Sequence, residues 1–426
     1  MSDWVTRRPD AVTRRPDACW GVIGHGPNAR LALWPPHERR LHLLSPTAAA
    51  VWESIDSTIS TRELVDRLAR RFDAAPAVIE RDIAPLLDRL INSGLATDPS
   101  APDGTIDLVD RSTLSSNVIS IGARVARCLI GPVGTFAGPL MIAVDDLQLS
   151  ETLRPILAPL IDTSERAAMI EINVRAHDDG WIVARDGVDV GWCTTRAHAL
   201  RTVLGEVNTA PLDHVTDAVV LHASAMIIGT PETGSRVLFP GISNSGKSTL
   251  AAQLCLRGHG YLTDEALAID VDTLGARPFH KSLCIEPSGQ AVLPELADLV
   301  PSHGLSAIWD VDPRKLEPGY LASGGPIDAV VFPTYTPGAV SSLTPLEPLE
   351  ALQRLIANAF DFSTVGQPAF ATLVELANTT PMYQLVHGGT GAQLVLLESR
   401  FGAGSLRPTP IQSRIERRSG GAVPAA

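Results

Sequence analysis

The residues best suited to chemistry lie in one short stretch, RVLFPGISNSGKSTL, at positions 236–250. The pattern of a phosphate-binding loop, G-x-x-x-x-G-K-[ST], is matched there by Gly241, Gly246, Lys247 and Ser248. Glycines let backbone N–H groups curl around a phosphate, and the following helix offers its unpaired N–H groups and positive dipole end to the anion. An ordinary Gly/Ser turn is the alternative, but it does not require a strand before these four positions and a helix after them. The stretch therefore predicts a nucleoside triphosphate site.

Known phosphate loops suggest a role for each polar group in this one. We expect Lys247 to reach the β- and γ-phosphates and the Ser248 hydroxyl to hold Mg²⁺. The residues expected to surround the phosphates are Gly241, Ser243, Asn244, Ser245, Gly246, Lys247, Ser248 and Thr249. ATP and Mg²⁺ are therefore the expected cofactors.

Two adjacent carboxylates, Asp264 and Glu265, follow a predicted strand at 261–263. Such a pair can be only a solvated turn. In a phosphate-loop protein, however, one carboxylate at this place can hold Mg²⁺ and a second can orient the nucleophile. Because neighbouring residues of an extended chain point to opposite sides, one can face the metal while the other faces an acceptor.

A histidine and a lysine accompany these groups. His222 lies inside the apolar run 218–228, where a lone histidine is usually a core residue, but the next predicted strand leads directly into the phosphate loop. Lys281 follows a turn at 273–275 and would add positive charge beside the triphosphate. An exposed loop lysine is the alternative for Lys281, and the sequence leaves both readings open.

Apolar periodicity predicts the elements that position these residues. Strands are expected at 170–176, 181–185, 218–228, 237–239, 261–263, 266–269, 383–386 and 393–397. Helices are expected at 150–160, 197–207, 247–257, 349–360 and 369–377. No residue between 117 and 211 suggests chemistry, and we expect that part to extend or flank the nucleotide-binding sheet.

Composition narrows the class of protein. A chain of 426 residues is too long for one core and predicts two or three domains. Its net charge of −12 argues against a nucleic-acid partner, and acidity also disfavours anionic membranes. Five scattered cysteines without a C-x-x-C pair indicate free thiols and no zinc site. With no signal-peptide pattern and no apolar run long enough to span a bilayer, we expect a cytoplasmic protein.

The chain before the phosphate loop divides into an arm, a module and a linker. Residues 1–19 hold two copies of VTRRPDA, too short to bury a core, so we expect a disordered arm that could serve as a basic docking segment. Residues 20–98 combine short strands, one of them at 39–44, with three helices and predict an α+β, winged-helix-like module. Residues 99–117 are polar and read as a linker, and 403–426 read as a disordered tail.

The run LSPTAAAVWESIDSTISTRELVDRLARRFDAAPAVIERDIAPLLDRLINSGLAT, at 44–97, resembles the PqqD family. The resemblance implies that a precursor peptide's leader adds to the strand at 39–44 and lies against the third helix. A dimerisation or DNA-binding winged helix is the alternative. DNA is disfavoured because the third helix carries Glu80, Asp82 and Asp88 beside only two arginines.

The later chain resembles the HPr kinase/phosphorylase superfamily, in particular its lasso-peptide-kinase-like branch. The segments that carry the resemblance are LHASA (221–225), GISNSGKST (241–249), RGHGYLTDEALAID (257–270), RPFHKSLCIEPSG (277–289), VVFPTY (330–335) and PMYQLV (381–386). It implies an α/β kinase domain at 118–402 whose sheet is related to that of phosphoenolpyruvate carboxykinase. It also implies that Asp264 is the base, assisted by His222, with Glu265 near the metal. The arginine- and glycine-rich signature of HPr kinase has no counterpart after Ile269, which argues against HPr as substrate and against phosphorylase activity.

Together these observations predict a kinase that transfers the γ-phosphoryl group of ATP to a Ser or Thr hydroxyl of a ribosomally made precursor peptide. The N-terminal module would tether the leader and so raise the effective concentration of the acceptor. Two alternatives stay open: a kinase of free serine or a sugar, and a peptide chaperone that uses ATP as a switch. A homo-oligomer is compatible with the sequence, which does not fix the subunit number.

Overall fold

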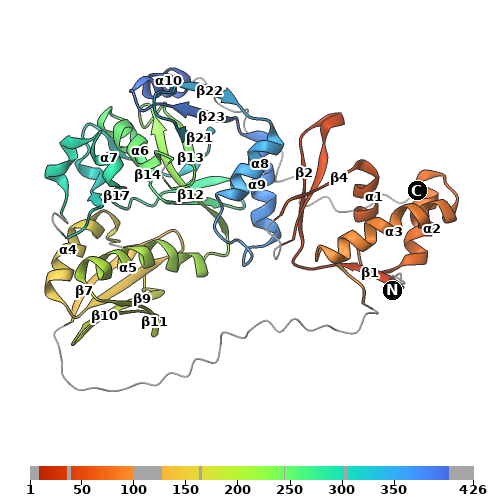
Figure 1. Cartoon of the computed structure of the whole chain (residues 1–426), viewed down its shortest axis with the longest axis horizontal. Coiled ribbons are helices and arrows are strands. Elements are labelled where there is room, and N and C mark those ends of the chain that lie inside the picture. The colour runs from red at the N-terminus through yellow and green to blue at the C-terminus, as the bar shows by residue number, and fades with distance from the viewer. Residues whose placement is uncertain are drawn as a thin grey trace, which may run out of the picture.

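The computed structural model describes residues 9–35, 40–99, 127–162, 166–243, 245–301 and 305–402. These residues form a small N-terminal domain, a five-stranded sheet with two helices, and a large mixed sheet covered by helices (Figure 1). The predicted linker at 99–117, apart from residue 99, and the predicted tail at 403–426 lie outside the described residues, as do residues 118–126. Within the described ranges, every helix is too short or too polar to cross a bilayer.

The N-terminal domain joins a three-stranded antiparallel sheet, in the order β2-β3-β4, to three helices. Its elements are β1 (Ala11–Arg14), β2 (Cys19–Ile23), β3 (Arg30–Trp34), β4 (His42–Leu44), α1 (Pro46–Ser54), β5 (Ile59–Ser60), α2 (Thr61–Phe72), α3 (Pro76–Asn92) and β6 (Ala96–Thr97). Helix starts follow the sequence signals, because Ser45 and Ser60 cap α1 and α2 by accepting hydrogen bonds from backbone N–H groups. Gly94, just after α3, takes the left-handed backbone conformation that favours glycine.

The expected disordered arm at 1–19 is wrong for its described part. Residues 11–14 form β1, which lies between the two-residue strands β5 and β6 and pairs with both. Val12 is fully buried, and the Arg14 guanidinium donates to the carbonyl of Trp52 while lying over its ring. The second copy of the repeat is therefore ordered, because β1 pairs with the edges of β5 and β6 and Arg14 packs on the ring of Trp52. Residues 1–8 lie outside the described part.

The second unit contains five strands in the order β11-β10-β9-β8-β7. Its elements are β7 (Cys128–Gly134), β8 (Pro139–Val144), α4 (Leu147–Leu157), β9 (Ile170–His177), β10 (Gly180–Arg185), β11 (Val188–Cys193) and α5 (Arg196–Thr209). The expected hairpin joins β9 to β10. This sheet is separate from the large one, so the unit flanks the large sheet without extending it, with α4 and α5 between the two (Figure 1).

The large sheet has the order β20-β16-β15-β12-β13-β21-β23-β22, and β14 lies between β12 and β19. Its strands are β12 (Ala218–Ile228), β13 (Ser235–Pro240), β14 (Gly260–Thr263), β15 (Ala266–Asp270), β16 (Gly275–Arg277), β19 (Tyr320–Leu321), β20 (Gly325–Pro326), β21 (Ala329–Tyr335), β22 (Ser342–Pro345) and β23 (Met382–His387). The helices around it are α6 (Lys247–Leu256), α7 (Pro287–Gln290), α8 (Pro348–Ala357), α9 (Gln367–Thr379) and α10 (Ala392–Phe401). A separate pair, β17 (Leu283–Ile285) and β18 (Trp309–Val311), lies beside α6.

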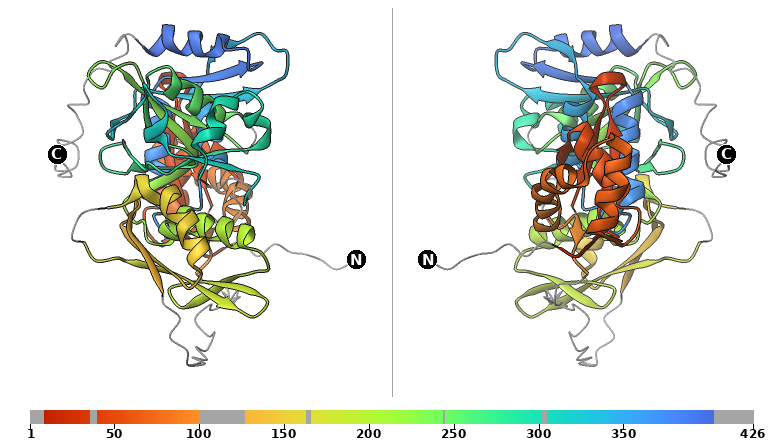
Figure 2. Two further views of the ribbon diagram at one scale, coloured as in Figure 1. Left: turned by 90° about the vertical axis from the view of Figure 1, so that its left-hand side faces the viewer. Right: turned by 90° about the vertical axis from the view of Figure 1, so that its right-hand side faces the viewer.

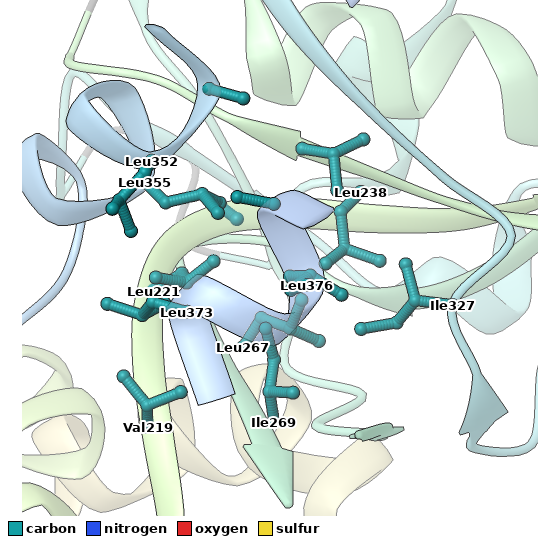
Figure 3. Close-up of a cluster of buried hydrophobic side chains, with 14 of the residues drawn as sticks. Val219, Leu221, Leu238, Leu267, Ile269, Ile327, Leu352, Leu355, Leu373 and Leu376 are labelled. Carbon is teal, nitrogen blue, oxygen red and sulfur yellow. The ribbon is translucent and has the colours of Figure 1, made fainter. Parts of the chain in front are cut away.

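The long strand β12 is buried on both faces, which explains its unbroken apolar sequence. Val219 and Leu221 point to the face covered by α9, where they share a core with Leu373 (Figure 3). Met226 and Ile228 point to the opposite face, which α6 and α10 cover. The period of two along β12 thus separates the two cores.

The strand predicted at 393–397 is wrong, because these residues belong to α10. Leu394, Leu397 and Phe401 are buried at spacings of three and four, which is helical periodicity. The short run Leu-Val-Leu-Leu fits either element when it is considered alone. The preceding Gly391, with a left-handed backbone, provides the helix start.

The N-terminal sheet is docked on the large unit through β2 and α9. The Gln367 side-chain amide accepts from the N–H of Trp20 and donates to its carbonyl, at 2.7 Å each. Asn378 accepts from the N–H of Gly24 at 2.9 Å and donates to the carbonyl of Val22 at 2.8 Å. Two side chains of α9 thus occupy the outer edge of β2, and the domain lies against α8 and α9 (Figures 1 and 2).

Candidate functional site

The phosphate-binding pattern folds into a loop between β13 and α6, as the sequence predicts. Gly246 has φ +89°, a left-handed conformation, and an added Cβ at Gly241 would lie 2.6 Å from the Ser245 hydroxyl. Lys247 is buried, and its ammonium donates to the carbonyls of Gly241 at 2.6 Å and Ile242 at 2.8 Å. Asn244 lies outside the described residues, whereas the other expected loop residues are all placed here.

The loop fits a phosphate by two further observations. The Ser245 hydroxyl is buried without a hydrogen-bond partner in the described part of the chain, and buried polar groups normally have one. The N–H groups in the first turn of α6 have no partner within the helix and can serve an anion, whereas the N–H of Gly241 donates to the carbonyl of His222. Burial lowers the pKa of Lys247, while nearby Asp264 acts to raise it.

Asp264 lies directly beside the loop serine. The Ser248 hydroxyl donates to one oxygen of Asp264 at 3.0 Å, and the N–H of Cys284 donates to the other at 3.3 Å. Asp264 is 1% exposed, and burial raises the pKa of its carboxyl group. Among the described residues no group of three or more His, Cys, Asp and Glu could enclose a metal. Mg²⁺ needs no such cage, since it uses one or two protein oxygens together with substrate phosphates and water, and Ser248 with Asp264 fits that role.

Glu265 faces Lys281, whereas Asp264 faces Ser248. The φ of Glu265, +97°, is rare for a residue other than glycine, and such strain is often found at functional sites. The Lys281 ammonium lies 3.4 Å from its carboxylate and holds the pKa of Glu265 below its usual value. His222, on β12, also faces the cavity, and burial together with the positive charge of Lys247 lowers its pKa.

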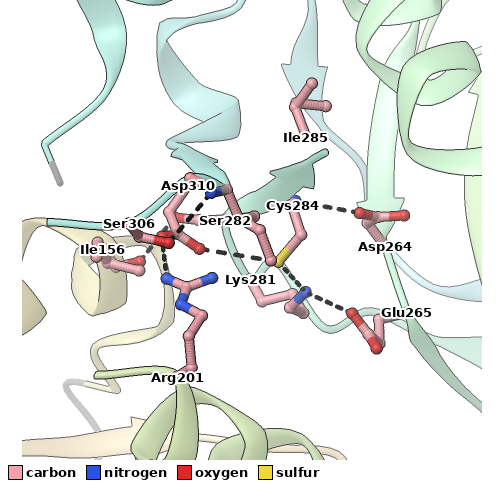
Figure 4. Close-up of polar contacts among 12 residues, drawn as sticks. Ile156, Arg201, Asp264, Glu265, Lys281, Ser282, Cys284, Ile285, Ser306 and Asp310 are labelled. Atoms are coloured by element: carbon pink, nitrogen blue, oxygen red, sulfur yellow. Dashed lines mark hydrogen bonds and ion pairs between the residues drawn. The ribbon is translucent and has the colours of Figure 1, made fainter. Parts of the chain in front are cut away.

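Two readings of Lys281 were left open, and the one that makes it an exposed loop lysine is wrong, because this residue is 6% exposed. Its ammonium also donates to the thiol of Cys284 at 3.3 Å, and that thiol contacts Asp310 (Figure 4). Burial acts to lower the pKa of Lys281, but Cys284 and the nearby carboxylates outweigh burial and raise this pKa. Lys281 therefore carries a buried positive charge between Glu265 and Cys284.

One cavity of about 440 Å³ is lined by His222, Lys247, Ser248, Asp264, Glu265 and Cys284. Lys281 does not line it but contacts two of the lining residues, Glu265 and Cys284. At one side of the cavity lie Tyr335 and His387, from the ends of β21 and β23, with the following Gly388 and Gly389. The imidazole of His387 would lie 3.3 Å from a Cβ at Gly246, so it packs on the loop itself. His387 was not among the predicted site residues, although the segment PMYQLV at 381–386 ends directly before it.

Another wall of the cavity comes from α5, in the region where the sequence suggested no chemistry. The residues that it contributes are Arg201, Leu204, Gly205 and Asn208. Arg201 forms an ion pair with Asp310, which connects α5 to the cluster around Cys284 (Figure 4). The only sequence signal for this wall is the helical spacing of three, four and seven residues, which does not by itself suggest a site.

A second hollow lies in the N-terminal domain between β4 and α3 and encloses about 670 Å³. Its apolar lining includes Leu43 and Ala48 on one side and Leu86 and Leu90 of α3 on the other. Among the described residues, β4 pairs with β3 only, so its other edge faces this groove. The predicted strand at 39–44 is observed at 42–44, with residue 39 outside the described part.

Comparison with protein families matches a part of the chain in the N-terminal domain. The family model described as coenzyme PQQ synthesis protein D (PqqD) matches residues 31–96, from β3 to β6, and so includes both walls of the groove. A search of curated proteins found no match to the chain. Residues 31–96 are therefore similar to PqqD, which supports an N-terminal peptide-recognition domain.

Proposed function

We propose that the protein is an ATP- and Mg²⁺-dependent kinase that phosphorylates a Ser or Thr hydroxyl of a ribosomally made precursor peptide. One observation carries the proposal: the hydrogen bond between Ser248 and Asp264 joins a phosphate-type loop to a carboxylate pair inside one cavity. A loop lysine that contacts the phosphates, and a loop serine and an aspartate that hold Mg²⁺, are the groups that P-loop enzymes use for phosphoryl transfer.

The N-terminal domain supplies the peptide side of the proposal. Its similarity to PqqD favours a precursor peptide as partner. The groove offers what a bound strand needs, namely the edge of β4 for main-chain hydrogen bonds and apolar positions on α3 for side chains. The leader would extend the sheet β2-β3-β4 by one strand.

Transition-state charge is stabilised by groups of this chain. Lys247 and the N–H groups at the start of α6 neutralise charge on the phosphate oxygens. Ser248 and Asp264 would hold Mg²⁺, which supplies further neutralisation of the triphosphate. Tyr335 and His387, beyond the loop, would flank the nucleoside.

The two carboxylates take roles opposite to those that the family resemblance implies. Asp264 contacts the metal-binding hydroxyl, whereas Glu265 faces Lys281 and the His222 side of the cavity. We therefore assign the acceptor's proton to Glu265, with His222 next to it. A bond forms between the acceptor oxygen and the γ-phosphorus, the bond from that phosphorus to ADP breaks, and Glu265 receives the proton.

Mass spectrometry of candidate precursor peptides, incubated with ATP and Mg²⁺, tests the proposal. Addition of one phosphoryl group to a Ser or Thr by the wild type, and its loss in Lys247→Ala, is the expected result. If phosphate is transferred to free serine or a sugar and no peptide is modified, the protein is a small-molecule kinase and the proposal of a peptide kinase is wrong. Tight ATP binding without transfer to any hydroxyl compound would instead favour a nucleotide-dependent switch.

A further inference from the structure

One wall of the cavity is not explained by binding of the nucleotide phosphates. Helix α5 presents Arg201, Leu204, Gly205 and Asn208 to the cavity, at spacings that place all four on one helix face. None of them belongs to the phosphate loop or to the carboxylate pair. The opposite face of α5 is packed in the core of the five-stranded unit, which fixes the position of this wall.

Two polar atoms of this wall have no partner in the described part of the chain. They are the Nε of Arg201 and the side-chain oxygen of Asn208, and both are buried from solvent. The rest of the Arg201 guanidinium is held by Asp310, itself 1% exposed, so the arginine cannot simply turn away. Because buried polar groups normally have partners, these atoms are suited to a ligand that carries both donors and acceptors.

Gly205 lies between Arg201 and Asn208 in the helix, and because it has no side chain it leaves the helix backbone uncovered there. An added Cβ would have no atom within 4 Å, so the space beside it is open. Glycine weakens a helix interior relative to alanine, and no packing in the structure requires it at this position. A bare backbone does, however, allow another main chain to approach closely.

The wall lies on the acceptor side of the cavity. Arg201 contacts Asp310, and Asp310 contacts the thiol of Cys284. The same thiol accepts from Lys281, which lies beside Glu265, the residue assigned to the acceptor's proton. Tyr335 and His387, at the ends of β21 and β23, lie instead against Gly246 of the phosphate loop. In-line transfer requires the acceptor oxygen to approach opposite the leaving ADP. A nucleoside on the Tyr335 side therefore directs the acceptor toward α5.

We propose that residues 201–208 of α5 form the acceptor subsite, which binds the main chain of the peptide beside the reacting hydroxyl. Gly205 lets the peptide backbone lie against the helix, and Asn208 and Arg201 hydrogen-bond its amide groups. This inference rests on the proposed kinase function and adds to it a binding surface for peptide main chain.

The test uses the full chain and a short leaderless peptide centred on the hydroxyl that the wild type phosphorylates. Gly205→Leu fills the open space and is expected to raise the KM for this peptide on the order of tenfold, with an unchanged KM for ATP. The matched control is His198→Leu, an exposed position on the same helix outside the cavity. Asn208→Ala is expected to raise the peptide KM as well, and it carries the test if Gly205→Leu does not fold.

Three results separate the possibilities. Wild-type peptide kinetics in Gly205→Leu and Asn208→Ala would overturn the subsite while leaving the kinase in place. An increased KM for ATP, with the peptide KM unchanged, would overturn it by making α5 a nucleotide wall. If the wild type binds ATP but transfers phosphate to no peptide, the proposed function fails and the subsite fails with it.

Discussion

Replacing each of the two adjacent carboxylates by its amide would separate the metal binding that we propose for Asp264 from the proton transfer that we propose for Glu265. Asp264→Asn and Glu265→Gln each remove one negative charge with almost no change of volume. In the structure Asp264 accepts a hydrogen bond from the Ser248 hydroxyl, whereas Glu265 lies beside Lys281. The two variants are therefore expected to fail in different ways.

For Glu265→Gln we expect kcat to fall by about 100- to 10,000-fold, the usual contribution of a positioned general base. That range corresponds to about 2.7 to 5.5 kcal/mol of transition-state stabilisation. The Kd for ATP and the Mg²⁺ concentration at half-maximal rate are expected to stay near wild type, since Ser248 and Asp264 are untouched. A fall in kcat without a change in nucleotide binding is the signature of a group that acts in the transition state.

For Asp264→Asn we expect a higher Mg²⁺ requirement and weaker ATP binding in the presence of Mg²⁺. The metal-free protein is expected to be at least as stable as wild type. Burial raises the pKa of Asp264 above the value of about 3.9 for a free side chain. The folded state then holds the proton more tightly, so stability falls as pH rises from about 3.9 through the raised folded value. At neutral pH the buried carboxylate costs stability, and asparagine removes that cost.

The assays are steady-state phosphotransfer with Mg²⁺ titration, nucleotide binding by calorimetry, and thermal unfolding without metal. Glu286→Gln, a change in a third carboxylate on the cavity wall, serves as the matched control. It is expected to change kcat less than tenfold. A raised Mg²⁺ requirement in Glu265→Gln, with a purely catalytic defect in Asp264→Asn, would refute our assignment and restore the roles implied by the family resemblance.

Three further predictions concern the N-terminal domain. Leu43→Asp, in the groove, should weaken binding of a labelled precursor peptide by about 10- to 100-fold in fluorescence anisotropy, while Val78→Asp outside it should not; equal losses would exclude this groove. Gln367→Ala combined with Asn378→Ala should weaken domain docking by about 2–4 kcal/mol and speed limited proteolysis between the domains, and wild-type cleavage rates would contradict the docking role. Deletion of residues 1–98 should lower the Tm as well as peptide affinity, because it uncovers the apolar face of α9; an unchanged Tm would show that this face needs no cover.

The local part of the site could be predicted because its signals are local. The phosphate loop needs glycine, lysine and serine at fixed spacing, and a strand and helix on either side, all within 15 residues. Asp264 follows from the end of the next strand. His222 follows from β12 preceding the loop strand, since the two strands pair and bring its backbone carbonyl to the N–H of Gly241.

The remaining parts depend on contacts between segments far apart in the chain. Arg201 reaches the cavity only because the five-stranded unit packs against one end of the large sheet, and no local pattern encodes that packing. The order of residues 11–14 depends likewise on the edges of β5 and β6. The helix at 392–401 was missed for a different reason, since a short apolar run fits a strand as well as a helix.

Because the N-terminal sheet is docked on α9, leader binding would do more than tether the peptide. A flexible tether only raises the local concentration of the acceptor. Here Gln367 and Asn378 occupy the β2 edge, while β4, the other edge of the same sheet, faces the groove. A leader bound at β4 is therefore held at a fixed position relative to the cavity. The N–H of His222, a cavity-lining residue, donates to the carbonyl of Asn358, which directly follows α8. The segment between the helices that carry the sheet therefore contacts one wall of the cavity through His222. The chosen hydroxyl would then be set by its distance along the peptide from the leader, which agrees with an acceptor wall that contacts main chain.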